Sequence, residues 1–322
     1  MTGVQIDIMF GASMVNGLLL LLGLAVLIKG AGFLVEGAST IASRIGVSSL
    51  AIGLTVVSLG TSMPEFFVSL TSGLQNKPDL AIANVIGSNI ANVLLVLGFA
   101  AIIRPIPVRN SIVVSEIPFS LSAALLLGFL ANAHLFSENP ELSISHLDGA
   151  ILLFFFFLFM LYVYKTSETK EIPVRQVAST VSAARAITLI VTGALGLYFG
   201  GQWVVDGAVG LAQDWGVNDA LIGLTIIAVG TSSPELVASA VAAYRNQTDI
   251  AVGNVIGSNI FNLLWVLGFT SSVVELQFDV ISNTDLMVVI GSSAMVILAL
   301  VSSRINTVKR SHGIVFVGMY IV

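Results

Sequence analysis

The sequence repeats itself at an interval of 170 residues, and this repetition limits the possible folds more than any other feature. Residues 52–65, IGLTVVSLGTSMPE, match residues 222–235, IGLTIIAVGTSSPE. Residues 79–99, DLAIANVIGSNIANVLLVLGF, match residues 249–269, DIAVGNVIGSNIFNLLWVLGF. Of the 53 residue pairs from 51/221 to 103/273, 26 are identical. The chain is therefore predicted to contain two copies of one structural unit.

Both copies are too apolar for a soluble domain. Hydrophobic residues make up 56% of the chain and charged residues 10%, whereas soluble domains contain roughly 25% charged residues. The apolar runs of about 20 residues are long enough to cross a hydrocarbon core of about 30 Å. We predict one all-α integral membrane domain of ten transmembrane helices, at residues 15–42, 48–74, 79–103, 112–133, 146–164, 184–212, 217–244, 249–273, 282–303 and 312 onward.

The two ends of the chain and its lack of cysteine bear on processing of the chain and on the chemistry available to it. The first residues, MTGVQIDIMFGAS, have no basic segment and no small-residue cleavage site, so no removable signal peptide is expected. The last apolar run is short for a span, which fits a C-terminus that has been trimmed. Because the chain has no cysteine, disulfides and cysteine-based metal or redox chemistry are excluded.

Five predicted spans in each copy is an odd number, so the second copy is expected to enter the membrane upside down relative to the first. The first repeat is predicted at residues 1–164 and the second at 184–322, with a polar linker at 165–183. Eleven Lys and Arg residues fall in one set of loops and one in the other, and basic residues are retained in the cytoplasm. Both termini are therefore predicted outside and the linker inside. Inverted repeats with interrupted helices are typical of secondary transporters.

Each copy has a polar interruption in its second predicted span, GTSMPE at 60–65 and GTSSPE at 230–235. Pro64 and Pro234 lack the N–H that a continuous helix needs, so each span is expected to break there. Unpaired backbone at this depth is tolerated only inside protein or along a polar cavity. Some carbonyls of the preceding turn are expected to lack helical partners. They lie at the negative end of a half-helix, which suits a cation. They are the carbonyls of Ser58, Thr61, Ala228 and Thr231.

A carboxylate follows each break. Glu65 and Glu235 stand directly after the prolines, at the predicted start of the next half-helix, where their side chains would face the break. Ionisable groups inside a membrane span are costly and usually functional. The alternative is a protonated structural carboxyl group that is hydrogen-bonded within the bundle, and the duplication of the motif favours function.

The next predicted span in each copy adds oxygen donors, in NVIGSNIAN at 84–92 and NVIGSNIFN at 254–262. The Ser and Asn four residues apart in each motif share one helical face. Those pairs are Ser88 with Asn92 and Ser258 with Asn262. Interhelical hydrogen bonding is the alternative role for these asparagines and tight helix packing for these serines. Asn89 and Asn259 lie one position off this face and are predicted to be structural.

Taken together, the motifs supply carboxylates, hydroxyls, amides and carbonyls, which are all oxygen donors. A hard cation such as Ca²⁺ is bound by six to eight oxygens, whereas transition metals more often recruit His or Cys. An intramembrane metallohydrolase would need a motif such as H-E-x-x-H, which is absent from the sequence. The chain is therefore predicted not to be an enzyme and to need no cofactor.

The duplicated GTSMPE and GNVIGSN-type segments resemble the two alpha-repeats of the cation/calcium exchanger superfamily, and most of all the compact prokaryotic sodium/calcium antiporters. The resemblance implies a core of spans 2, 3, 7 and 8, across which spans 1 and 6 slide. It implies Glu65 and Glu235 as central ligands shared by Ca²⁺ and Na⁺. The further ligands that it implies are Ser62, Ser88, Asn92 and the Ser58 and Thr61 carbonyls, with Ser232, Ser258, Asn262 and the Ala228 and Thr231 carbonyls in the second copy.

The resemblance predicts an antiporter that exchanges Ca²⁺ for Na⁺ by alternating access in a prokaryotic plasma membrane. Inorganic cations and the lipid bilayer are the expected partners, with no nucleic acid and no obligatory protein partner. Many relatives have Asp at the position of Asn262. Because Asn is neutral where those relatives have a carboxylate, the predicted site has only two negative charges. Two charges match one Ca²⁺ or two Na⁺. The absence of a third charge disfavours obligatory K⁺ co-transport. A Ca²⁺/H⁺ antiporter is the alternative, and a channel is disfavoured because one chain supplies both halves of the site.

Overall fold

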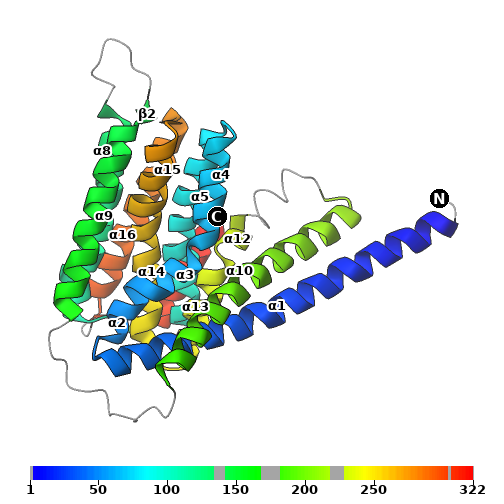
Figure 1. The fold of residues 1–322 in the computed structure, drawn as a ribbon, viewed down its shortest axis with the longest axis horizontal. Coiled ribbons are helices and arrows are strands. Elements are labelled where there is room, and N and C mark those ends of the chain that lie inside the picture. Colours follow the sequence, from blue (N-terminus) through cyan, green and yellow to red (C-terminus); the bar gives the residue numbers. More distant parts are fainter. Residues whose placement is uncertain (1–2, 134–141, 168–181, 218–227, 304–305, 322) are drawn as a thin grey trace.

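The protein is a bundle of long apolar helices. The computed structural model describes residues 3–133, 142–167, 182–217, 228–303 and 306–321 (Figure 1). Within these ranges, seven helices are long and apolar enough to cross a membrane, and an eighth span results when the two bent parts of residues 49–74 are counted together. The prediction of an all-α membrane protein is therefore confirmed at this level.

The first half of the chain contains the helices of the first five predicted spans. The second and third of these spans each change to π-helix partway. The elements are α1 (Gly3–Ile45), α2 (Ser49–Ile52), the π-helical η1 (Gly53–Val57), α3 (Ser58–Thr61), α4 (Met63–Leu74), α5 (Pro78–Ala91), the π-helical η2 (Asn92–Leu97), α6 (Gly98–Ile103), α7 (Asn110–Val114), α8 (Glu116–Ala131) and α9 (His146–Ser167).

The described helices of the second half follow a similar order. They are α10 (Ala183–Asp214), α12 (Ala228–Thr231), α13 (Ser233–Tyr244), α14 (Thr248–Ile260), the π-helical η5 (Phe261–Val266), α15 (Leu267–Val273), α16 (Val280–Val301) and α17 (Arg310–Ile321). Part of the predicted seventh span, residues 218–227, lies outside the described residues. The helix α17 has 12 residues, too few to cross a bilayer by itself. The count of ten spans therefore stays a prediction.

Two very short antiparallel ladders join the halves of the chain. Strand β1 (Ile106–Pro107) pairs with β4 (Thr307–Val308), and β2 (Ser143–Ile144) pairs with β3 (Leu276–Gln277). In each ladder, one strand follows a candidate span that contains an NVIGSN motif, Pro78–Ile103 or Thr248–Val273, and the other strand comes from the opposite half. The sequence did not predict these ladders, because two residues are too few to show an alternating pattern.

The helices α1 and α10 lie side by side and reach away from the rest of the bundle (Figure 1). They run antiparallel and approach closely. A Cβ atom on Gly30 would lie 2.9 Å from the carbonyl oxygen of Gly193, and one on Gly200 would lie 2.7 Å from the backbone nitrogen of Leu27. Side chains at these positions would therefore force the two helices apart.

The core surrounds α14, η5 and α15. Of the apolar window in Thr248–Val273, 94% is buried, the largest share of any candidate span in the described residues. Around it, buried side chains from both halves pack together, including Val85, Leu127, Phe159 and Leu263. The second NVIGSN motif therefore lies in the most deeply buried of the candidate spans in the described residues.

Candidate cation site

Both predicted breaks have the same local geometry. The axes of Ser49–Thr61 and Met63–Leu74 differ by 47°. The residue at the break has φ −84° and ψ 5° at Ser62, and φ −86° and ψ 8° at Ser232. A proline lies in the first turn of the helix that follows in each copy, where its missing N–H does no harm. The prediction of a broken helix in each copy is therefore confirmed.

The two carboxylates stand in the first turns of α4 and α13 and are fully buried, since Glu65 and Glu235 are both 0% exposed. The hydroxyl of Ser88 donates to Oε1 of Glu65 over 3.3 Å. The hydroxyl of Ser62 donates to Oε1 of Glu235, also over 3.3 Å. Because this second bond joins the break of one repeat to the carboxylate of the other, the two motifs face each other.

Several buried oxygens at these motifs have no hydrogen-bond partner in the part of the chain that the structure describes. They include Oε2 of both glutamates and the Ser232 hydroxyl. The amides of Asn92 and Asn262 are 0% exposed and lack partners on both their oxygen and their nitrogen. A buried polar group without a partner costs about 1–3 kcal/mol. A cluster of such oxygens is therefore the expected form of a site built for a ligand.

The unpartnered amides stand on distorted helix. Asn92 is the first residue of η2, and Asn262 is the second residue of η5. The segment η2 packs against α13, which contains Glu235, and η5 packs against α4, which contains Glu65. Each amide thus stands on a segment that packs against the half-helix of the opposite repeat. Single π-helical turns are frequent at functional sites.

Thr61 and Ser258, from opposite repeats, also meet at this place. Their hydroxyl oxygens are 3.3 Å apart, and the Thr61 hydroxyl lies 3.0 Å from Oδ1 of Asn254. In the second copy, Ala228 begins the short helix α12 and Thr231 ends it. The twelve residues predicted for the site therefore all lie on the broken helices or on the helices that follow them.

One expectation about the backbone is wrong. The Ser58 carbonyl was expected to lack a helical partner, but it accepts the backbone N–H of Ser62 over 2.9 Å and the Thr61 hydroxyl over 3.3 Å. The reason is that a proline removes only its own N–H, so the interruption falls on the carbonyl four residues before Pro64, at Gly60. The Ser58 hydroxyl itself binds the carbonyl of Asn254 over 3.1 Å.

Four residues that position the carboxylates were missed by the sequence argument. The amide nitrogen of Asn84 donates to the Glu65 carbonyl over 3.1 Å and to the Ser69 hydroxyl over 2.9 Å. In the second copy, Asn254 donates to the Glu235 carbonyl over 3.4 Å and to the Ser239 hydroxyl over 2.9 Å. All four were already visible as identities at the 170-residue interval.

Replacing Asn254 with Ala is expected to lower the stability of the protein by about 1–3 kcal/mol, because Glu235, Ser239 and Thr61 would each lose a buried partner. Asn84→Ala is the matched control. Its side chain is partly exposed, so water can replace some of the lost bonds and a smaller loss is expected. The measurement is the midpoint of thermal unfolding, and a greater loss in Asn84→Ala would contradict this assignment.

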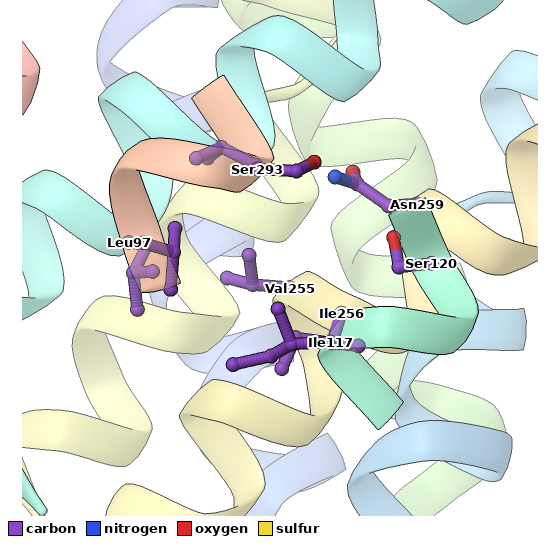
Figure 2. A pocket seen from close by; sticks show the side chains of 9 residues that line it. Leu97, Ile117, Ser120, Val255, Ile256, Asn259 and Ser293 are labelled. Atoms are coloured by element: carbon purple, nitrogen blue, oxygen red, sulfur yellow. The ribbon is translucent and has the colours of Figure 1, made fainter. Parts of the chain in front are cut away.

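Asn89 and Asn259 have the structural role predicted for them. Each amide nitrogen donates to the backbone carbonyl of the other residue, over 3.2 Å and 3.4 Å. Figure 2 shows Asn259 beside a small cavity of about 20 Å³, with the hydroxyls of Ser120 and Ser293 turned toward its amide. A cavity of this size holds about one water molecule, so it is too small for a second substrate site.

The charge of the site comes from two glutamates alone. Among the described residues, no cluster of three or more His, Cys, Asp or Glu side chains is placed to hold a metal ion. Glu65 and Glu235 are instead accompanied by neutral oxygens of Ser, Thr and Asn. Such a mixture of carboxylate and neutral oxygen ligands suits Ca²⁺ and other hard cations.

Comparisons with known proteins find similar chains. The family model described as sodium/calcium exchanger protein matches residues 15–165 and 185–322. The chain is 35% identical to the putative antiporter CaxA of Alkalimonas amylolytica, over 81% of this chain and 82% of that protein. It is 31% identical to the sodium/calcium exchanger MaX1 of Methanosarcina acetivorans, over 95% and 97% of the two chains.

The fold also matches solved structures. A structure of the sodium-calcium exchanger NCX_Mj, soaked with Na⁺ and Ca²⁺, superposes with a TM-score of 0.79. The two sequences are 32% identical, and the match covers 95% of this chain and 96% of the other. The likeness thus extends over the whole bundle.

Proposed function

The chain belongs to the sodium/calcium exchanger protein family, and from that premise we propose that it exchanges Na⁺ for Ca²⁺ at the site between Glu65 and Glu235. The family is one of transporters and not of enzymes. The observation that supports the location best is the set of unpartnered buried oxygens on these glutamates and on Asn92 and Asn262. A bound cation would satisfy these oxygens, which have no partner in the described protein. The remaining predicted ligands are Ser62, Ser88, Ser232, Ser258 and the carbonyls of Ser58, Thr61, Ala228 and Thr231.

We infer a ten-span architecture of two inverted repeats, at residues 1–164 and 184–322. It is supported by the antiparallel packing of α1 and α10 and by the matching breaks at Ser62 and Ser232. The ladders that tie each half to the other also fit this symmetry. With both termini outside, the linker at 165–183 would lie in the cytoplasm of a prokaryotic cell.

The charge of the site explains why Na⁺ and Ca²⁺ would exchange for each other. The two buried carboxylates repel each other when the site is empty. One Ca²⁺ or two Na⁺ would cancel their charge, whereas Na⁺ and Ca²⁺ together would exceed it, so the two cations compete for the same oxygens. Asn262 adds no charge, which makes an obligatory K⁺ alongside Ca²⁺ unfavourable. Loading by either cation would favour closure of the site.

The moving part in this proposal is the pair α1 and α10. Ser13 and Asn16 of α1 bind the carboxylate of Asp214 at the end of α10, over 2.8 Å and 3.1 Å. These bonds and the close glycine contacts join the two helices into one unit. A shift of this unit across α4 and α13 would open the site to either side in turn. Access would alternate only when a bound cation stabilises the shifted state.

Calcium flux in proteoliposomes tests the function. Uptake of radioactive calcium should follow an outward Na⁺ gradient at clamped pH and should stop when the Na⁺ gradient is removed. The alternative within the same fold is Ca²⁺/H⁺ exchange, because two facing carboxylates can also bind protons. Uptake driven by a pH gradient and indifferent to Na⁺ would replace our proposal with that alternative. Single-channel currents would argue for a channel.

A further inference from the structure

A second buried carboxylate lies apart from the exchange site. Glu116 is the first residue of α8 and is only 3% exposed. Its Oε1 accepts the hydroxyl of Tyr162 over 3.1 Å. Its Oε2 is buried and has no hydrogen-bond partner among the described residues. A bare carboxylate oxygen in this position costs several kcal/mol unless the group is protonated or binds a cation.

Glu116 borders a cavity of about 180 Å³ between the start of the broken span, α8 and the end of α9. The polar residues that line the cavity with it are Ser48, Arg109, Tyr162, Thr166 and Ser167. These elements meet the basic loops on the face that we propose to be cytoplasmic. A cavity of about 10–15 Å³ can hold one water molecule, so this cavity has room for a cation together with several waters.

The charges around the cavity favour a monovalent cation. Arg109 lies 2.7 Å from the carboxylate of Asp249, in an ion pair that offsets its positive charge. Glu116 is the one acidic side chain among the residues that line the cavity. One carboxylate balances one monovalent charge, whereas a divalent cation would leave an excess. The hydroxyls of Ser48, Tyr162 and Thr166 are neutral oxygens of the kind that complete the shell of a hard cation.

We propose that this cavity binds one alkali cation, Na⁺ or K⁺, with the carboxylate of Glu116 as its charged ligand. The cation keeps part of its water shell, because the cavity is several times larger than a bare ion. Leu50, Ala51 and Leu54 also line the cavity. These residues belong to the half-helix that ends at Thr61 in the exchange site. Occupancy of the cavity would therefore stabilise one position of that half-helix.

The test measures cation-dependent stability in a protein whose exchange site has lost its charge. In the background Glu65→Gln with Glu235→Gln, melting temperatures are compared in choline, sodium and potassium chloride at equal concentration. Sodium or potassium is expected to raise the melting temperature by about 1–3 °C, since a ligand at tenfold excess over its Kd stabilises by about 1.4 kcal/mol. The sodium and potassium arms show which of the two cations binds.

Adding Glu116→Gln to this background should remove the cation-dependent shift, and Tyr162→Phe should reduce it. Glu36→Gln, at an exposed carboxylate on α1, is the matched control and should keep the shift. Each shift is measured within one variant, so a change in baseline stability does not affect the reading. The wild-type protein saturated with Ca²⁺ is a second background if the double variant does not fold.

Three results would overturn the proposal. The first is a shift of equal size with and without Glu116→Gln. The second is equal stability in choline, sodium and potassium chloride, which would mean that Glu116 is a protonated structural group. The third is a Glu116-dependent shift produced by added anionic phospholipid in choline chloride and not by the salts. All of these outcomes are independent of Ca²⁺ flux, so they distinguish failure of this site from failure of the exchange function.

Discussion

Replacing Glu65 with Gln is expected to stop Na⁺-driven Ca²⁺ uptake while leaving the protein folded. The substitution keeps the shape of the side chain and an oxygen to accept the Ser88 hydroxyl, which donates over 3.3 Å. It removes one of two charges at the site. Ca²⁺ carries two charges, so its attraction to one carboxylate about 4 Å away is about 8 kcal/mol at an effective dielectric constant of about 20, twice the value for two unit charges. Because desolvation of the carboxylate offsets part of this attraction, the expected decrease in Ca²⁺ affinity is on the order of a thousandfold or more.

Glu235→Gln should have the same effect, because Ser62 holds this carboxylate as Ser88 holds the other. Calcium uptake in proteoliposomes is the measurement, with the melting temperature as the check on folding. Glu275→Gln is the matched control, since Glu275 is exposed and lies outside the site; its uptake should equal that of the wild type. Normal uptake by a folded Glu65 or Glu235 variant would refute the assignment of these residues.

The polar breaks and their carboxylates could be predicted from the sequence because their chemistry conflicts with their surroundings. Pro64 has no N–H with which to continue the helical hydrogen bonds, and a Glu65 side chain that faced lipid would cost free energy. The repetition at Pro234 and Glu235 then excluded coincidence. These features can be predicted without knowledge of the tertiary packing. The 47° bend and the buried glutamates therefore agree with the prediction.

The contacts across the repeats could not be predicted in the same way. The bond from Ser62 to Glu235 depends on how two half-helices face each other, and neither sequence segment specifies that. The π-helical turns at Asn92 and Asn262 have no signature in the residues NVLLVL and FNLLWV, which are ordinary apolar helix. Their backbone is set by packing against α13 and α4. The Ser58 carbonyl is a different case, because its partners, the Ser62 N–H and the Thr61 hydroxyl, are local and Pro64 removes only its own N–H.

Asn84 and Asn254 are an intermediate case. Both were part of a recognised motif, but spacing along the helix assigns residues to faces and does not say which face meets the carboxylate helix. Their partners, Ser69 and Ser239, lie fifteen residues earlier in each copy. In each copy the Asn and the Ser are both identical to their counterparts in the other copy, and this shared repetition could have indicated that they contact each other. The duplication therefore contained more positional information than the motifs alone.

A disulfide between α10 and α13 is expected to arrest exchange, and reduction should restore it. A Cβ on Gly201 would lie 3.2 Å from the hydroxyl oxygen of Ser233, the atom that the sulfur would replace in Ser233→Cys, so the two side chains are close enough for the short Cβ–Cβ spacing of a disulfide, about 3.8 Å. Ser233 Oγ has no hydrogen-bond partner among the described residues, so its replacement should cost little. The chain has no cysteine of its own, so Gly201→Cys with Ser233→Cys can form only this intramolecular pair.

The linked protein holds the α1 and α10 unit against the helix of Glu235, so the proposed shift across the core cannot occur. Calcium uptake should fall in proportion to the fraction of linked molecules and return after treatment with dithiothreitol. Each single-cysteine variant, oxidised in the same way, controls for the substitutions themselves and should be insensitive to the reductant. Ca²⁺ binding to the linked protein should persist, because the linkage leaves Glu65 and Glu235 in place. Undiminished uptake by fully linked protein would show that exchange proceeds without movement between α10 and α13, and the moving element would then have to be sought within the core helices.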